Sequence, residues 1–275
     1  MSRARTQGRI RVGIGGWTYA PWRGSFYPKG LAQRRELEYA AQRLRSIEIN
    51  GTYYGSQKPA SFARWRDETP DDFVFAVKAP RYATNRRVLA QAGPTIERFF
   101  ASGVMELGDK LGPVNWQFLP TKAFDAEDFA AFLGLLPGVV DGRKLRHAVE
   151  VRHESFRTPE FVELARAHEV AIVLSADGPY PQIADPSGAF VYARIMGTRE
   201  DVLLGYPPAE LDRWARRAAT LASGALPEDL DYVLPARVDL APREVFLYVI
   251  SGHKARNPQA AMALQERLDK GPDAL

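Results

Sequence analysis

The segment His147-Ala-Val-Glu-Val-Arg-His153 has the composition of a strand that carries charged groups on one face. Side chains alternate along an extended chain, so Glu150 and Arg152 share one face and two valines share the other. A charged face is poorly suited to an ordinary apolar core, because buried charges must be paired. The segment therefore indicates a strand whose charged face opens into a polar pocket.

A second segment repeats this pattern earlier in the chain. In Ser46-Ile-Glu-Ile-Asn50, Glu48 and Asn50 share one face and the two isoleucines share the other. We interpret both segments as strands of one barrel that deliver polar groups to a shared site.

Six further segments have the length and the β-branched or aromatic composition of strands, at residues 11–16, 73–78, 113–119, 170–175, 190–195 and 245–250. Stretches with helical features separate most of them, and we expect helices at residues 31–44, 59–68, 94–107, 125–135, 158–168, 208–223 and 258–268. Asp125 and Thr158 are expected to be the N-caps of two of these helices. Residues 178–189 are too rich in Pro and Gly for a full helix, and residues 224–244, with three prolines, are expected to form an irregular excursion.

Eight strands alternating with helices predict an α/β fold, a single (β/α)8 TIM barrel over residues 1–275. The irregular or missing helix follows the sixth strand, and the excursion precedes the eighth. A doubly wound open sheet is the alternative. Its phosphate-binding fingerprint is missing, because Gly13-Ile-Gly-Gly16 lacks the later glycine and leads into a long aromatic loop.

Composition narrows the class of protein. The chain contains no cysteine, which excludes disulfides and thiolate metal sites and fits a reducing cytoplasm. No apolar run follows the basic residues 1–10, so we expect no secretory signal, and none approaches the ~20 residues of a membrane helix. The net charge of +4 suits an anionic ligand, although an Arg-rich soluble surface explains it equally simply. We therefore expect a cytoplasmic protein with no membrane partner.

Several motifs, in the same order, resemble those of the YecE-like family, a bacterial and archaeal domain of unknown function. The opening signature is Gly13-Ile-Gly-Gly-Trp-Thr-Tyr19, followed by Trp22-Arg-Gly-Ser-Phe-Tyr-Pro28. The later motifs are Glu48-Ile-Asn-Gly-Thr-Tyr-Tyr54, Phe73-Val-Phe-Ala-Val-Lys78, Glu150-Val-Arg-His153 and Tyr192-Ala-Arg-Ile-Met-Gly197. The resemblance runs through nearly the whole chain. It implies a TIM barrel and brings no assigned reaction.

The sequence departs from the family pattern at three places. Thr84-Asn85 stands where the family tends to have Thr-His, and Met196 stands where it tends to have His before Gly. Ser251-Gly-His253 replaces an Asn-rich turn near the eighth strand. Either this chain has an altered or lost activity, or these positions were never catalytic.

Polar residues at the carboxyl ends of barrel strands form the working face of such folds. The predicted catalytic pair is Glu48 and Glu150, whose pKa values neighbouring charges would separate into acid and base roles. The predicted ligand-binding residues are Tyr19, Asn50, Tyr53, Lys78, Gln117, Arg152, His153, Asp177 and Arg194. Among these, the lysine and the two arginines would clamp a phosphate or a carboxylate.

Structural roles compete with each of these assignments. Glu48 would equally serve as an ion-pair partner of Arg152 or Lys78 that holds barrel strands together. His153 would cap a loop, and Asp177 before Gly-Pro would be a turn residue.

A divalent metal ion is the one cofactor that the sequence suggests, by analogy of fold only. Its ligands would be Glu48, Glu150, Asp177 and His153. No histidine pair at helical spacing supports this site, and the arginines and lysine compete for the carboxylates. We therefore predict no metal ligand.

These features favour a YecE-like barrel with a pocket at its C-terminal face for a small anionic or phosphorylated ligand. Hydrolase- or lyase-type acid–base chemistry is the first hypothesis, and nuclease-like phosphate chemistry, with a nucleic acid as partner, is a weaker variant. The alternative is a non-catalytic ligand-binding or sensor protein that keeps the pocket.

Overall fold

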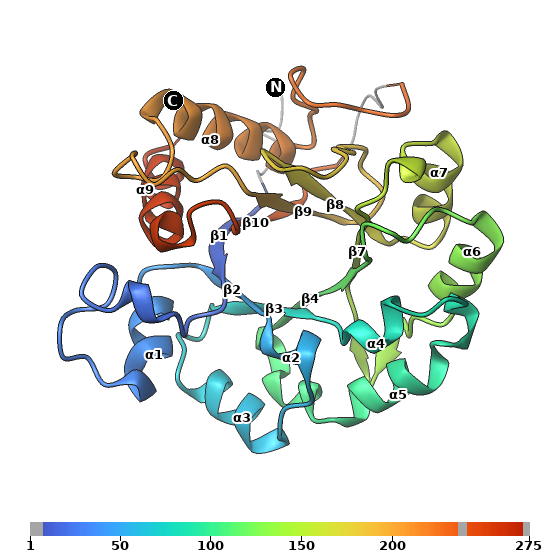
Figure 1. The fold of residues 1–275 in the computed structure, drawn as a ribbon, viewed down its shortest axis with the longest axis horizontal. Helices are drawn as coiled ribbons and strands as arrows, with labels where there is room; N and C mark the ends of the chain where they lie inside the picture. The colour runs from blue at the N-terminus through green and yellow to red at the C-terminus, as the bar shows by residue number, and fades with distance from the viewer. Residues whose placement is uncertain (1–7, 236–240, 272–275) are drawn as a thin grey trace, which may run out of the picture.

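The computed structural model describes residues 8–235 and 241–271. Eight parallel strands close into a barrel in the order β1-β10-β9-β8-β7-β4-β3-β2 (Figure 1). They are β1 (Ile10–Gly15), β2 (Ser46–Ile49), β3 (Val74–Lys78), β4 (Leu111–Gln117), β7 (His147–Glu150), β8 (Ala171–Ala176), β9 (Phe190–Ile195) and β10 (Glu244–Val249). Each strand predicted from the sequence is present, and the TIM-barrel fold is confirmed.

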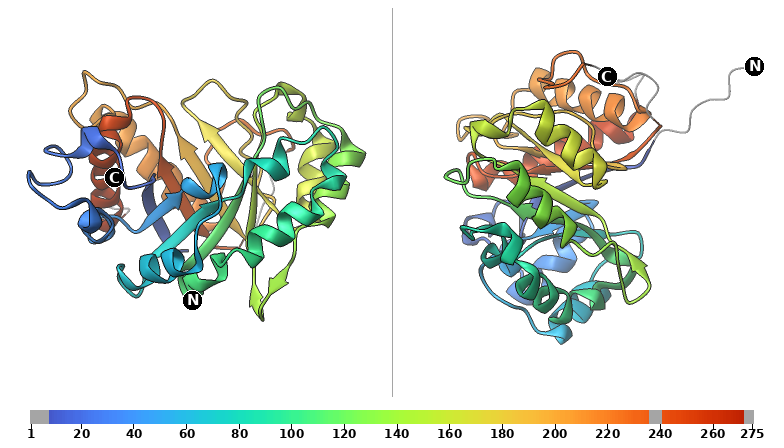
Figure 2. Two further views of the ribbon diagram at one scale, coloured as in Figure 1. Left: turned by 60° about the horizontal axis from the view of Figure 1, so that its bottom comes forward. Right: turned by 90° about the vertical axis from the view of Figure 1, so that its right-hand side faces the viewer.

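Helices cover the outside of the barrel, and Figure 2 shows the strands slanting between them. The longer helices are α1 (Glu36–Ala41), α3 (Pro59–Asp67), α5 (Gly93–Ala101), α6 (Ala126–Gly134), α7 (Pro159–Ala167), α8 (Pro208–Ser223) and α9 (Asn257–Asp269). Both predicted N-caps are confirmed, since Asp125 accepts a hydrogen bond from the Asp128 N–H and Thr158 accepts one from the Phe161 N–H. No helix in the described part of the chain is long and apolar enough to cross a membrane.

Several details differ from the sequence-based expectation. The helix expected at residues 31–44 is limited to α1 (Glu36–Ala41), preceded by a 3₁₀ turn over Gln33–Arg35. Helix α5 ends at Ala101, because Gly103 adopts a left-handed conformation with φ 102°, and a 3₁₀ segment over Val104–Lys110 follows. Two short helices that were not expected follow strands closely: α2 (Gly51–Tyr54) follows β2, and α4 (Arg81–Thr84) follows β3. A small antiparallel hairpin, β5 (Val139–Val140) and β6 (Arg143–Lys144), precedes β7.

The two irregular connections are as predicted where the structure describes them. Residues 178–189 contain no helix, and residues 224–235 and 241–243 contain neither helix nor strand. The rest of the expected excursion lies outside the described residues.

Two apolar clusters hold the barrel together. The larger one lies between strands and helices, and its strand residues include Val12, Ile14, Ile47 and Val149. The smaller one is formed mainly by strand residues of the opposite alternation, which point into the barrel, among them Val74, Ala76, Val173, Phe246 and Tyr248. Apolar side chains therefore fill the middle of the barrel and leave polar groups for its two ends.

The amino-terminal end of the barrel carries a paired charge cluster. The Arg11 Nε atom donates to Glu244 at 2.5 Å, and the Arg146 guanidinium lies 2.6 Å from the other oxygen of the same carboxylate. Charges at this end of a TIM barrel serve stability. The carboxyl ends of the strands form the opposite mouth, where the candidate site lies.

Candidate functional site

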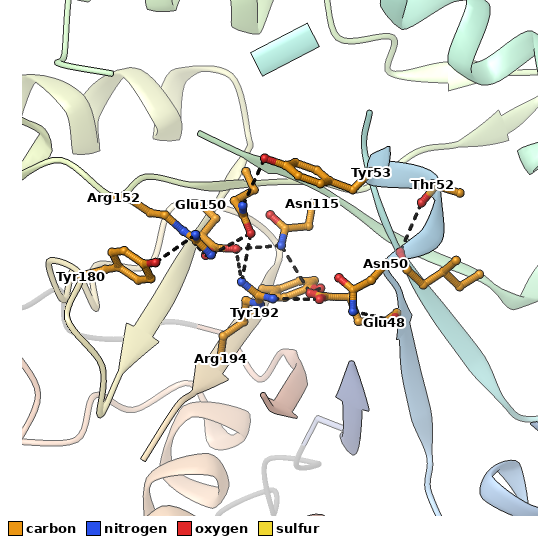
Figure 3. A network of polar contacts seen from close by, with 12 residues as sticks. Glu48, Asn50, Thr52, Tyr53, Asn115, Glu150, Arg152, Tyr180, Tyr192 and Arg194 are labelled. Carbon is orange, nitrogen blue, oxygen red and sulfur yellow. Dashed lines mark hydrogen bonds and ion pairs between the residues drawn. The ribbon is translucent and has the colours of Figure 1, made fainter. Parts of the chain in front are cut away.

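Charged side chains from separate strands converge at the carboxyl-terminal mouth of the barrel (Figure 3). Glu48 lies on β2, Lys78 ends β3, Glu150 ends β7 and Arg194 lies on β9, while Arg152 follows β7. Glu48 and Glu150 are fully buried, and Arg194 is 3% exposed. We refer to these five residues as the mouth network. The structure therefore brings together the five charged residues at the centre of the predicted site.

Arg194 forms the centre of the mouth network. Its Nη2 atom lies 3.0 Å from Glu48 and its Nη1 atom donates to Glu150. The Asn115 amide bridges the same two carboxylates, at 3.4 Å from Glu48 and 3.2 Å from Glu150. The Tyr192 hydroxyl donates to Glu48 at 2.5 Å. Both carboxylates are thus held by donors from neighbouring strands.

Arg152 is the second arginine of the mouth network, and it is also occupied by protein acceptors. It donates to Glu150 from Nε at 2.8 Å and from Nη2 at 2.6 Å, and to the side-chain amide oxygen of Gln117 at 2.8 Å. Its Nη1 atom donates to the Tyr180 hydroxyl, and the guanidinium carbon lies 4.2 Å from the centre of that ring. Arg152 and Tyr180 also line a surface hollow of about 390 Å³.

Electrostatics keep both carboxylates ionised. Burial alone would raise the pKa of Glu150, but Arg194 and Arg152 outweigh burial and lower the pKa to about 2. The pKa of Glu48 is lowered as well, because Arg194, Lys78 and the Tyr192 hydrogen bond together outweigh burial. Neither carboxyl therefore carries a proton to donate near neutral pH.

The lowered pKa of Glu150 predicts how the free energy of unfolding changes at acidic pH. The folded-state pKa of Glu150, about 2, lies below its ordinary value of 4.5. The resulting stabilisation is complete above pH 4.5 and is lost as the pH falls towards 2, on the order of 3 kcal/mol. We expect urea unfolding at pH 7, 5, 4 and 3 to show a steep decline below pH 4.5. A free energy of unfolding that stays constant from pH 5 to pH 3 would contradict the pairing.

Lys78 is the cation of the mouth network that has no ion-pair partner in the described part of the chain. The residue is 8% exposed, and its Nζ atom lies 4.9 Å from the ring centre of Tyr53. None of the described residues accepts a hydrogen bond from Nζ or forms an ion pair with it. Burial and the nearby Arg194 charge lower the pKa of Lys78 to about 8, although the two glutamates partly oppose this effect.

Three buried polar atoms at this end of the barrel lack a hydrogen-bond partner among the described residues. They are Arg194 Nε, Asn115 Oδ1 and Ser175 Oγ. Ser175 and Arg194 lie side by side on β8 and β9. Because nearly all buried polar atoms in proteins are hydrogen-bonded, such a group marks a place where the chain leaves bonding capacity unused.

Three other predicted residues lie at or near the network. Asn50 donates weakly to the Glu48 backbone oxygen at 3.4 Å. The Tyr53 hydroxyl lies 3.5 Å from the Gln117 amide nitrogen. Tyr53 and Gln117 thus border the network, and Asn50 sits beside it at the end of β2.

Tyr19, His153 and Asp177 are held elsewhere. Tyr19 packs edge-on against Trp22, with ring centres 5.3 Å apart. His153 accepts a hydrogen bond from the Ser155 N–H and so caps a short 3₁₀ turn. Asp177 accepts hydrogen bonds from the Tyr206 hydroxyl and the Trp214 indole, which bind it to the region of α8.

The four residues considered for a metal ion are therefore not assembled. Glu48 and Glu150 lie in the network, whereas Asp177 and His153 are hydrogen-bonded to the other partners described above. Within residues 8–235 and 241–271, no group of three or more His, Asp or Glu side chains is placed to hold a metal ion.

Three members of the site were missed in the sequence. Asn115 lies two residues before Gln117 on β4, and Tyr192 lies two residues before Arg194 on β9. The alternation of side chains along a strand was a signal that would have found both. Tyr180 lies in an irregular connection, where no periodic signal was available.

Comparison with protein families identifies one match to nearly the whole chain. The model of the family described as "Protein of unknown function DUF72" matches residues 11–274. The UPF0759 protein YecE of Escherichia coli K12 is 29% identical over 150 residues, which cover 54% of this chain and 50% of that protein. The UPF0759 protein YunF of Bacillus subtilis is 26% identical over 159 residues, which cover 56% and 54%. The chain spans about half the length of the curated relatives it matches.

Solved structures agree with the barrel. A DUF72 family protein from Thermotoga maritima has a TM-score of 0.73 at 21% identity, with 95% of this chain and 99% of that chain covered. A DUF72 family protein from Enterococcus faecalis has a TM-score of 0.68 at 18% identity, with 97% and 99% covered. A xylose isomerase-like TIM barrel fused to a 4-hydroxyphenylpyruvate dioxygenase has a TM-score of 0.52 at 16% identity, with 98% and 45% covered. At these identities the likeness supports the fold alone.

Proposed function

The chain belongs to the DUF72 family of proteins of unknown function, and we propose that it binds a small anionic ligand at the carboxyl-terminal mouth of its barrel, through Lys78. The observation that carries this proposal is the ammonium group of Lys78 at the end of β3, which has no hydrogen-bond or ion-pair partner among the described residues.

The charge balance of the mouth network supports an anion. Three cations, Lys78, Arg152 and Arg194, face two anions, Glu48 and Glu150, so the network carries a net charge of +1. Each arginine is engaged by at least one carboxylate, and the surplus therefore resides on the lysine. A buried cation without a partner destabilises a protein unless a ligand or solvent compensates it. A carboxylate or phosphate group would supply that compensation.

We assign the other charged groups to positioning. Arg194 is closed off by its two carboxylates, and Arg152 is closed off by Glu150 and Gln117. The two arginines hold Glu48 and Glu150 in position, and these carboxylates contribute to the electrostatic potential at Lys78. General acid catalysis by the two glutamates has little support, because both stay ionised near neutral pH. With a pKa of about 2, Glu150 is also a weak base. If the ligand is transformed, Lys78, with its pKa of about 8, is the network group suited to exchange a proton.

Lys78→Met is expected to weaken anion binding at least about thirtyfold, because it removes the surplus cation. Lys78→Arg, which keeps the charge, is expected to stay within about fivefold of the unchanged protein. Titration calorimetry at pH 7 with inorganic phosphate, citrate and glycerol 3-phosphate measures both effects. Lys270→Met is the matched control, since this lysine lies in an exposed surface pair with Glu266.

Two outcomes would overturn the proposal. One is equal anion affinity in Lys78→Met and in the unchanged protein. The other is the absence of binding for all three anions at millimolar concentration. Far-UV circular dichroism of the variant separates a loss of binding from a loss of fold.

A further inference from the structure

We infer that a second hollow at the same mouth binds a sugar ring that carries an anionic group. This hollow measures about 420 Å³ and lies at the carboxyl ends of β1 and β2. Trp17, Tyr54 and Trp65 provide its aromatic walls, Asn50 and Gln57 its amides, and Lys254 its cation. An apolar cleft of this size with a few polar groups, at this face of a barrel, has the usual character of a small-molecule site.

The indole groups provide the first argument. Three of the five tryptophans donate their indole N–H to a protein acceptor: Trp22 to Lys254, Trp116 to His147 and Trp214 to Asp177. The two that line the hollow, Trp17 and Trp65, donate to no acceptor among the described residues. Neither of these two indole nitrogens is among the buried atoms that lack a partner, so both N–H groups are accessible from outside the protein. These two donors are therefore available to a ligand rather than committed to the fold.

The shape of the aromatic walls favours a sugar. Trp17 and Trp65 meet at 77° with ring centres 5.0 Å apart, so they form a corner rather than a parallel slot. A flat nucleobase fits best between parallel rings, whereas a puckered ring places C–H groups on one indole face and hydroxyls at the edge of the other. The amides of Asn50 and Gln57 each offer a donor and an acceptor, which suits neighbouring hydroxyl groups.

Hydrogen bonds hold the segments on both sides of the hollow in place. The Tyr27 hydroxyl donates to the Trp17 carbonyl at 2.5 Å, which holds the aromatic loop after β1. The Trp22 indole donates to the Lys254 carbonyl at 2.9 Å, which links that loop to the turn after β10. Lys254 Nζ makes no ion pair with any described residue and lies 4.4 Å from the ring centre of Tyr19. A preformed cleft whose cation is neutralised by no described carboxylate suits a phosphorylated or otherwise acidic sugar.

Intrinsic tryptophan fluorescence with glucose 6-phosphate, mannose 6-phosphate, unphosphorylated glucose and adenosine monophosphate tests this inference. Binding of a hexose phosphate is expected to change the emission in a saturable way. Trp17→Ala should weaken that binding at least about tenfold, whereas Trp17→Phe should weaken it less. Lys254→Met should weaken the binding of the phosphorylated sugars at least about tenfold and leave the binding of glucose unchanged. Lys270→Met is the surface control.

Lys78→Met separates this hollow from the mouth network. We expect it to weaken the binding of inorganic phosphate and to leave the hexose phosphate binding that depends on Trp17 within about twofold, so failure of either site can be recognised without the other. The inference is overturned if no hexose phosphate binds, if adenosine monophosphate binds and the sugars do not, or if Trp17→Ala binds as tightly as the unchanged protein. Calorimetry on the same variants checks that the fluorescence change reports binding.

Discussion

Arg194→Met is expected to lower the free energy of unfolding by about 3–5 kcal/mol, because it leaves two fully buried carboxylates without their shared cation. The loss reflects the desolvation of Glu48 and Glu150 rather than the strength of one hydrogen bond. Chemical denaturation at pH 7 measures it directly. Arg199→Met is the matched control, because its pair with Glu210 is exposed and should contribute less than about 1 kcal/mol.

The pH dependence of this variant identifies the cause. Burial is already the largest single influence on the pKa of Glu48, and without the opposing charge of Arg194 we expect it to raise that pKa above the ordinary value. A folded-state pKa above the unfolded value stabilises the protein as the pH falls, so the deficit of the variant should shrink between pH 7 and pH 4.5. Replacing both glutamates by glutamine in the same variant should restore part of the loss. A deficit no larger than that of Arg199→Met would show that Arg194 does not hold the network together.

The sequence predicted the convergence of charge because the fold rule and the alternation rule act together. Glu48, Lys78, Glu150 and Arg194 lie on the inward alternation near the carboxyl ends of parallel strands, and a closed barrel brings those ends to one mouth. The same reasoning extends to Asn115, which was missed because only the last polar residue of that strand was considered.

The pairing within the mouth network was harder to predict. Glu48 was expected to pair with Arg152 or Lys78 if its role is structural, yet its ion-pair partner is Arg194. Which cation remains unpaired depends on side-chain length and on the register of strands far apart in the sequence. Neither the composition of the chain nor the alternation of side chains along a strand reveals this reach or this register. The surplus charge on Lys78 therefore became visible only in the structure.

Residues just beyond a strand end were the least predictable. Asp177 follows β8 and adopts a positive φ of 56°, and its carboxylate accepts hydrogen bonds from Tyr206 and Trp214 rather than joining the network. Those partners lie 29 and 37 residues further along the chain, beyond any local signal. The unpredicted hairpin β5–β6, in contrast, has a recognisable turn at Asp141-Gly142, with φ values of 49° and 73°.

Gly13→Ala is expected to destabilise the barrel by about 3 kcal/mol, at the upper end of the range for overpacking. Gly13 lies on β1 between Ser46 of β2 and Tyr248 of β10. A Cβ atom at this position would lie 2.3 Å from the Ser46 carbonyl oxygen and 3.0 Å from the Tyr248 ring. The carbonyl belongs to the backbone of a paired strand, so it cannot rotate away as a side chain would. Relief requires β1 and β2 to separate, and a closed barrel has no free edge to absorb that movement.

Gly134→Ala is the matched control, because the same substitution is expected not to destabilise the protein at this position. Gly134 is exposed at the end of α6, and an added Cβ atom would meet no other atom within 4 Å. Alanine favours the helix over glycine, so this variant should be as stable as the unchanged protein or up to about 1 kcal/mol more stable. Denaturation of both variants at pH 7 measures the difference. If the free energies of unfolding of Gly13→Ala and Gly134→Ala agree within about 0.5 kcal/mol, the close approach of β1 and β2 does not exclude a side chain at position 13. The predicted clash with the Ser46 carbonyl would then be wrong.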